Sequence, residues 1–412
     1  MKNSNFIKES TGMASYKIII LGPRRSGKTV FLASMYRRLS IPGQFKIFLE
    51  CDSSPIVINP TDGREMSPSQ LLAERYANLA NPNKDWEPGT VDVEKWHFTC
   101  KVQRPDLDFK DFTACNFTYL DYAGGDLVLQ QNPELDRELQ EADSLLGLLD
   151  GEKILSLLRN EGDGYTQITQ DLGNMLPILM RKKNPVHFVI SKWDLLHRDF
   201  SLEQVRDRLL EEEFFRDFVQ NRIDGNSSVR LIPMSAVGME FVKLEDGIMK
   251  KIPGKSLKPF QVEMPLACVL PDKVKFELEQ VAKKKQELLN QQINYSSQVG
   301  FWDSLLEFAG TAIDWFRQSI VADLPLELRF TDEILKKFSA AARAGAQQTR
   351  EQQENRIREL EYQRNKSLKS VTDEESALKY TIDVFLEMQA KLDYSFPDSL
   401  IKLPKNSSRL YN

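Results

Sequence analysis

The chain has 412 residues, of which 41% are hydrophobic and 28% are charged, and its formal net charge is −5. A chain of this length buries a sizeable core and is long enough for about two to three domains. The small net charge argues against a protein built mainly to bind nucleic acid or an anionic membrane. The four cysteines are far apart and form no C-x-x-C pair, so a structural zinc site is not expected.

The start of the chain lacks the apolar core of a signal peptide, and no run approaches the roughly 18 apolar residues of a membrane span. The cysteine usage is simplest in a reducing compartment. We therefore expect a cytoplasmic protein.

Short apolar runs alternate with helical patterns from residue 16 to about 285, which is typical of a parallel sheet covered by helices. The predicted strands are 16–22, 96–102, 114–124, 144–151, 186–194 and 229–236, and the predicted helices are 28–39, 133–142, 152–159, 166–181, 202–220 and 263–288. The second and third strands leave no room for a helix between them. We therefore predict an α/β fold whose mostly parallel sheet has one antiparallel edge strand.

The chain divides into two predicted domains, 16–288 with a long insertion at 40–95, and an α-helical region over 289–412. From 331 to 394 there is no proline, and Gln, Glu, Arg and Lys dominate. This pattern predicts two long helices. The second is expected to open at Thr372, with Glu375 at capping-box spacing.

The segment 301–320 carries apolar side chains on one helical face, namely Phe301, Leu305, Phe308, Ala312, Trp315 and Phe316. Such a stripe can pack on the rest of the chain, grip a partner helix or lie on a membrane. Acidic residues outnumber basic ones in this segment, which weakens the membrane alternative. We favour packing within the chain.

A phosphate-binding pattern, G-x-x-x-x-G-K-[ST], occupies residues 22–29 with the sequence GPRRSGKT. It lies between a predicted buried strand and a predicted helix, where backbone N–H groups and the helix dipole attract phosphate. Lys28 is expected to neutralise the β and γ phosphates, and the Thr29 hydroxyl to ligate Mg²⁺. The predicted nucleotide contacts are Gly22, Arg25, Ser26, Gly27, Lys28, Thr29 and Val30.

The third strand ends in Asp121-Tyr122-Ala123-Gly124, which fits D-x-x-G. An acid at the end of a buried strand can hold Mg²⁺ through water, and the Gly124 N–H can meet the γ phosphate. Turns often contain this pattern, so its position after a hydrophobic strand is what makes Asp121 a predicted metal ligand.

Two later motifs point to guanine. Ser191-Lys192-Trp193-Asp194 differs by one residue from [NT]-K-x-D, and the Asp194 carboxylate can accept from the guanine N1–H and exocyclic amine. Lys192 is expected to lie along the base and ribose; a strand-end ion pair is the alternative for this tetrapeptide. The loop Ser235-Ala236-Val237 is similar to S-A-[KL], whose backbone N–H groups reach the guanine O6.

These motifs, in this order at predicted strand ends, resemble those of P-loop GTPases of the Ras-like and translation-factor (TRAFAC) class. The likeness covers about residues 16 to 285. The long loop and the helical tail also resemble bacterial double-GTPase-like proteins of conflict or defence gene clusters. The resemblance implies GTP or GDP and Mg²⁺ as ligands, a switch I position for the 40–95 insertion, and a switch threonine that ligates Mg²⁺, for which Thr90 fits better than Thr61.

Two departures from that family concern hydrolysis. Gly125 stands where many members have a water-orienting glutamine, so we predict slow intrinsic turnover. Arg24 occupies a position that is often glycine, and either Arg24 or Arg25 can act as an arginine in cis or be simply solvated. The predicted catalytic residues are Lys28, Thr90, Gly124 and Arg24.

The sequence therefore predicts a GTP-binding and slowly GTP-hydrolysing regulatory switch. Its expected partners are a guanine nucleotide and a protein effector, contacted by switch loops or the helical tail; nucleic acid is not expected. The alternatives are a dynamin-like helical GTPase and a nucleotide-binding scaffold with little hydrolysis.

Overall fold

The computed structural model describes residues 13–59, 62–86, 93–122, 133–245, 248–290 and 349–403. Thr61, Thr90, Gly124, Gly125 and the 301–320 stripe therefore lie outside the described residues. None of the helices in the described ranges has the length and hydropathy needed to cross a lipid bilayer.

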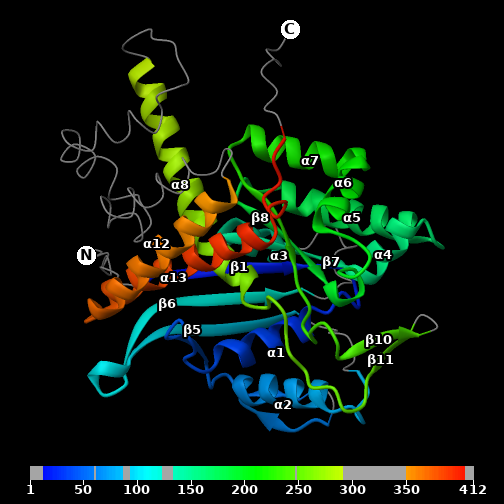
Figure 1. The fold of residues 1–412 in the computed structure, drawn as a ribbon, viewed down its shortest axis with the longest axis horizontal. Helices are drawn as coiled ribbons and strands as arrows, with labels where there is room; N and C mark the ends of the chain where they lie inside the picture. Colours follow the sequence, from blue (N-terminus) through cyan, green and yellow to red (C-terminus); the bar gives the residue numbers. More distant parts are fainter. Residues whose placement is uncertain are drawn as a thin grey trace, which may run out of the picture.

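Seven strands form one mixed sheet (Figure 1), in the order β2 (Ile47–Cys51), β5 (Glu94–Arg104), β6 (Lys110–Asp121), β1 (Ser15–Leu21), β7 (Ser144–Asp150), β8 (Val186–Ser191) and β9 (Val229–Pro233). β5 is antiparallel to both of its neighbours, and the pairs from β6 to β9 are parallel. The predicted α/β fold with a mostly parallel sheet is confirmed. β2, a short strand within the insertion that the sequence analysis does not predict, pairs outside β5, so the antiparallel strand is second from the edge.

Helices cover both faces of the sheet. The strand β1 shows the division, because Ile18 and Ile20 belong to one hydrophobic core and Ile19 and Leu21 to the other. The first core is shared with α1 (Lys28–Leu39), α8 (Met264–Asn290) and α13 (Glu374–Ser395). The second is shared with α3 (Pro133–Glu141), α4 (Gly151–Arg159), α5 (Gly164–Met180), α6 (Leu202–Glu211) and α7 (Glu213–Asp224). Burial on both faces explains why the central strands read as continuous apolar runs.

One predicted helix, 202–220, is two helices in the structure. Glu212 lies between α6 and α7 with extended backbone angles, φ −70° and ψ 113°, which interrupt the helical ladder. In Figure 1 both helices lie above the strands as drawn, on the opposite side from α1.

The insertion contains its own small elements. These are the hairpin of β3 (Val57–Ile58) and β4 (Glu65–Met66), and the helix α2 (Pro68–Ala80), whose side chains Leu71 and Leu72 pack into the core beside α1. A second hairpin, β10 (Val242–Glu245) with β11 (Ile248–Lys251), follows the last sheet strand. The 3-10 turns η1 (Pro105–Leu107) and η3 (Trp193–Leu195) complete the connections.

The C-terminal helices are α12 (Arg350–Lys369) and α13. The capping box of α13 uses Asp373 and Ser376, one residue beyond the predicted Thr372 and Glu375, so that prediction was wrong by one position. Aspartate accepts the first-turn N–H more effectively than threonine at an N-cap, which accounts for the shift.

The helix α13 belongs to the core of the sheet. Its Phe385 ring lies 6.4 Å from that of Phe117 on β6. The buried Arg230 of β9 donates to Asp272 of α8 at 2.7 Å and to Asp393 of α13 at 2.6 Å. Within the region predicted to be a separate helical domain, the described helix α13 thus contributes to the same core as the sheet.

Candidate nucleotide-binding site

The loop between β1 and α1 has the backbone of an anion cradle. Gly27 caps α1 with φ 86°, a left-handed conformation that favours glycine, and the Ser26 N–H donates to the Pro23 carbonyl at 3.2 Å. Among the described residues no side chain caps this helix, and its first turn holds no acidic residue. The first N–H groups of α1 are thus left for an external anion.

Lys28 lies across this loop. Its ammonium donates to the Gly22 carbonyl at 2.9 Å and the Pro23 carbonyl at 3.3 Å, and the residue is only 6% exposed. Burial lowers the pKa of Lys28, and the nearby Asp121 opposes that change. A buried cation therefore lies at the centre of the loop, where a phosphate would neutralise it.

The two consecutive arginines of the loop, Arg24 and Arg25, are exposed. Arg25 has φ 71°, and neither guanidinium forms an ion pair with a residue that the structure describes. Ser26 is fully buried, and its hydroxyl has no hydrogen-bond partner among the described residues. Val30 is half-buried and packs against the small cluster that contains Val237.

Asp121 and Thr29 meet beside the loop. The Thr29 hydroxyl donates to Asp121 Oδ2 at 3.4 Å, and the other carboxylate oxygen, Oδ1, has no partner within the described part of the chain. Burial raises the pKa of Asp121 to about 7, although Lys28 opposes the rise. A hydroxyl and a buried carboxylate are oxygen ligands of the kind that Mg²⁺ prefers, so these two residues fit the predicted metal site.

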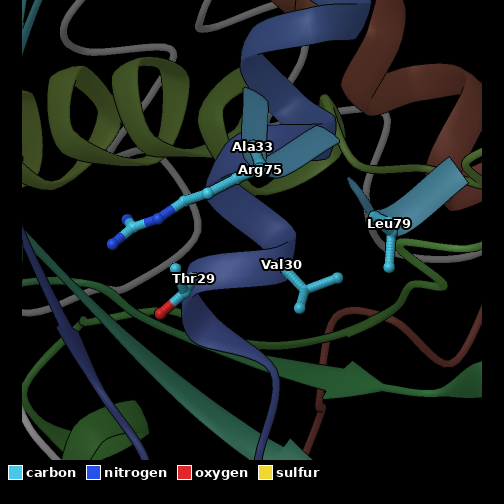
Figure 2. Close-up of a pocket in the computed structure, with 5 residues that line it drawn as sticks. All are labelled: Thr29, Val30, Ala33, Arg75 and Leu79. Carbon is cyan, nitrogen blue, oxygen red and sulfur yellow. The ribbon is translucent and has the colours of Figure 1, made fainter. Parts of the chain in front are cut away.

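A pocket opens next to Thr29 (Figure 2). It is lined by Thr29, Val30 and Ala33 of α1 and by Arg75 and Leu79 of α2. The Arg75 side chain reaches from α2 toward the Thr29 end of this pocket in Figure 2. The insertion thus forms one wall of the pocket beside Thr29.

In the tetrapeptide Ser191-Lys192-Trp193-Asp194 at the end of β8, the two charged side chains have different surroundings. Asp194 is 9% exposed, and neither carboxylate oxygen has a hydrogen-bond partner among the residues described. Burial raises the pKa of Asp194. The Trp193 N–H donates to the Met234 carbonyl at 3.0 Å, which ties this turn to the next strand end. Asp194 is therefore a buried acceptor pair held in a fixed loop.

Lys192 forms a strand-end ion pair, as the alternative for this motif predicts. Its ammonium donates to Asp150 at 2.9 Å and to Glu152 at 3.1 Å, both at the start of α4. Ser191 donates to the Leu149 carbonyl at 3.1 Å, so it braces the strand end. The ion pair fixes the position of the Lys192 stem.

The last motif is joined directly to the helix of the phosphate loop. The Ser34 hydroxyl of α1 donates to the Ala236 carbonyl at 2.9 Å. Ser235 accepts from the Gly238 N–H at 2.9 Å, and Val237 is buried. The helix α1 therefore contributes both to the phosphate side and to the loop predicted to reach the base.

The structure brings the predicted site residues that it describes into two connected groups at the C-terminal ends of the parallel strands; Thr90 and Gly124 lie outside the described residues. The first group contains Gly22 to Val30 and Asp121. The second contains Ser191 to Asp194 and Ser235 to Val237. Asp150 was not predicted as a site residue, although it ends a buried run just as Asp121 does, and that position was the available signal. The pair of Arg75 and Glu94 was not predicted either, because sequence spacing carries no signal for it.

Neither the protein-family models nor the curated proteins compared with this chain match it. Among solved structures, the signal recognition particle receptor SRb-GTP/SRX complex from Chaetomium thermophilum is similar at 17% identity and a TM-score of 0.32, over 55% of this chain and 93% of that one. Nucleolar GTP-binding protein 1 from Plasmodium falciparum is similar at 10% identity and a TM-score of 0.34, over 69% of this chain and 99% of that one. These are distant likenesses of fold, and what the site binds is inferred from this chain's own residues.

Proposed function

We propose that this chain binds GTP together with Mg²⁺, hydrolyses it slowly and acts as a nucleotide-dependent switch. The observation that carries the proposal is a pair of buried carboxylates at the C-terminal edge of the sheet: Asp121 Oδ1 and both oxygens of Asp194 have no hydrogen-bond partner among the described residues. Unpartnered buried carboxylates are costly, and a cation for one and paired N–H donors for the other remove that cost.

The triphosphate is held by the loop between β1 and α1. Uncapped N–H groups of α1 and the buried Lys28 ammonium supply donors and positive charge. Thr29 and Asp121 would hold Mg²⁺, which when bound neutralises charge on the β and γ phosphates. Ser26 supplies a buried hydroxyl at the same loop.

Guanine selectivity is assigned to Asp194. Its two oxygens accept from the N1–H and the exocyclic amine of guanine, a donor pair that adenine does not present. Lys192, held by Asp150, lies along the base, and backbone N–H groups of Ser235 to Val237 approach O6. A site built for paired donors rejects a base that lacks them, because its buried acceptors are then left unpaired.

Turnover is proposed to be slow because Gly125 provides no side chain to orient water. The segment proposed to respond to nucleotide is the 40–95 insertion, which lines the pocket beside Thr29 through α2. The helix α13 is buried against the sheet, so displacing it would disrupt the core. We therefore propose that a protein effector binds the insertion and not α13.

The decisive experiment is nucleotide competition on the full chain, with the base varied. GTP and GDP should displace bound GDP, whereas ATP should be at least about 100-fold weaker. Asp194→Asn should weaken GTP and favour xanthosine triphosphate, because the amide reverses one hydrogen-bonding sense. Asp199→Asn is the matched control, since Asp199 follows the same turn but is exposed and paired with Arg159. Equal competition by ATP and GTP in the wild type contradicts the assignment.

A turnover assay on the isolated chain separates the switch from a scaffold. Release of phosphate from GTP, abolished by Lys28→Ala, supports the switch. Tight GTP binding with no phosphate release favours a nucleotide-binding scaffold.

A further inference from the structure

Arg75 is a buried arginine in the insertion for which the proposed nucleotide contacts leave no role. Its side chain is 6% exposed, and it lines the pocket beside Thr29 (Figure 2). The guanidinium donates to Glu94 through two bonds, at 2.7 and 2.8 Å, and lies 5.5 Å from the Trp96 ring. This arginine is therefore held in one orientation at the wall of the pocket beside Thr29.

The helix that carries Arg75 is fixed at both ends. Ser67 and Gln70 form its capping box. At the other end the Lys251 ammonium of β11 donates to the carbonyls of Asn78 and Asn81, at 3.0 and 2.8 Å. These contacts hold the backbone of α2, so the Arg75 side chain starts from a defined position beside the pocket.

The charges of Arg75 and Glu94 lie close to the predicted metal site. Glu94 is the register partner of Asp121 in the β5–β6 ladder. Both Arg75 and Glu94 act electrostatically on the Asp121 carboxyl. Thr29 bonds to Asp121 and lines the same pocket as Arg75, so Arg75 lies beside the two residues predicted to hold Mg²⁺.

The two loop arginines differ from Arg75 in how firmly their side chains are held. Arg24 and Arg25 are exposed, so each must lose side-chain freedom to reach a phosphate. Arg75 is already ordered, and its planar fork matches paired phosphate oxygens as well as it matches the Glu94 carboxylate. A buried ion pair adds little net stability, so stability alone is a weak explanation for it.

Building on the proposed GTPase function, we infer that Arg75 is a catalytic residue supplied in cis by α2. In the chain without nucleotide Glu94 holds the guanidinium; with GTP bound it contacts γ-phosphate oxygens and stabilises the charge that develops on them. Water forms a bond to the γ phosphorus as the bond from that phosphorus to the β–γ bridging oxygen breaks. The products are GDP and inorganic phosphate, and the proton from water passes to phosphate or solvent; Arg75 transfers none.

The test combines single-turnover hydrolysis of GTP with binding of GDP to the full chain. Arg75→Ala should slow hydrolysis at least about 100-fold, while GDP affinity stays within about threefold. Arg75→Lys keeps the charge without the fork and should slow hydrolysis at least about tenfold. Arg64→Ala is the matched control, because Arg64 lies in the same insertion and pairs with Glu74 but is exposed. It should leave the rate unchanged.

A transition-state readout separates a catalytic role from a structural one. The GDP-bound wild type should bind aluminium fluoride, which mimics the transferred phosphoryl group, and Arg75→Ala should lose this binding while keeping GDP. If Arg75→Ala fails to fold, the same two measurements on Arg75→Lys decide the question, and a wild-type rate in that variant overturns the inference.

Three outcomes contradict the role of Arg75. Hydrolysis at the wild-type rate in Arg75→Ala overturns it while leaving the GTPase proposal intact. Parallel losses of GDP binding, hydrolysis and thermal stability assign Arg75 to structure alone. A wild-type chain that binds no GTP overturns both this inference and the proposed function.

Discussion

The Lys192 ammonium lies 2.9 Å from Asp150 Oδ2, and this ion pair joins the turn after β7 to the turn after β8. Burial by itself lowers the pKa of Lys192, but Asp150 and Glu152 outweigh it and raise the pKa. Lys192 also has a left-handed backbone, with φ 51°. The conformation of this turn and the charge pair are therefore fixed together before any base is bound.

Lys192→Met keeps the apolar stem and removes the ammonium, which leaves the buried Asp150 without this partner. We expect GDP affinity to fall about tenfold and the free energy of unfolding to fall by about 1–3 kcal/mol. Equilibrium GDP binding and urea unfolding measure the two effects. Lys153→Met is the control, because Lys153 of α4 pairs with Asp171 of α5 at 2.7 Å and forms no ion pair with Asp150. It should lose stability without losing GDP affinity; equal loss of affinity in both variants contradicts the prediction.

Asp121 should make the stability of the nucleotide-free chain depend on pH. Burial raises the pKa of Asp121 from 3.8 to about 7. The folded chain therefore holds this proton more tightly than the unfolded chain, and the free energy of unfolding contributed by Asp121 falls as the pH rises from about 4 to about 7. Asp121→Asn removes this dependence, so without Mg²⁺ the variant should melt several degrees above the wild type at pH 8 and near it at pH 4.

Addition of Mg²⁺ and GTP supplies the control for that measurement. The wild type should regain stability, by about 2.7 kcal/mol at a hundredfold excess over the dissociation constant, and Asp121→Asn should not. A melting-temperature difference that stays constant from pH 4 to pH 8 contradicts the assigned role of the buried carboxyl.

Gly151 permits the close approach of the two turns that Lys192 and Asp150 join. A Cβ at this position would lie 2.9 Å from the Lys192 carbonyl oxygen and closer still to that of Ser191, and both are backbone atoms. Gly151→Ala should therefore displace the turn, cost about 1–3 kcal/mol of stability and weaken GDP. Gly173→Ala, in α5 with no atom within 4 Å of the added Cβ, should raise stability by up to about 1 kcal/mol. Urea unfolding compares the two, and a neutral Gly151→Ala contradicts the packing argument.

The central strands and the phosphate loop were predictable because their signals are local. In a strand buried on both faces, such as 144–150, apolar residues follow one another with almost no polar residue between them. The phosphate loop at 22–29 has the residues of its motif at their fixed spacing. The edge strand β2 was not predictable, since Ile47 to Leu49 form a run too short to stand out in a polar insertion. The break at Glu212 was missed for a similar reason, because an amphipathic pattern continues across it.

Sequence alone thus determined the order of the strand-end motifs and the chemical groups that they supply, because parallel strands place their C-terminal ends on one edge whatever the rest of the chain does. Tertiary structure decided which of those groups are already paired. It joined Lys192 to Asp150 and Arg75 to Glu94 and left Asp121 and Asp194 with open oxygens among the described residues. The reason is physical: burial and partnership depend on residues distant in sequence, and pattern and spacing do not encode which of them will meet.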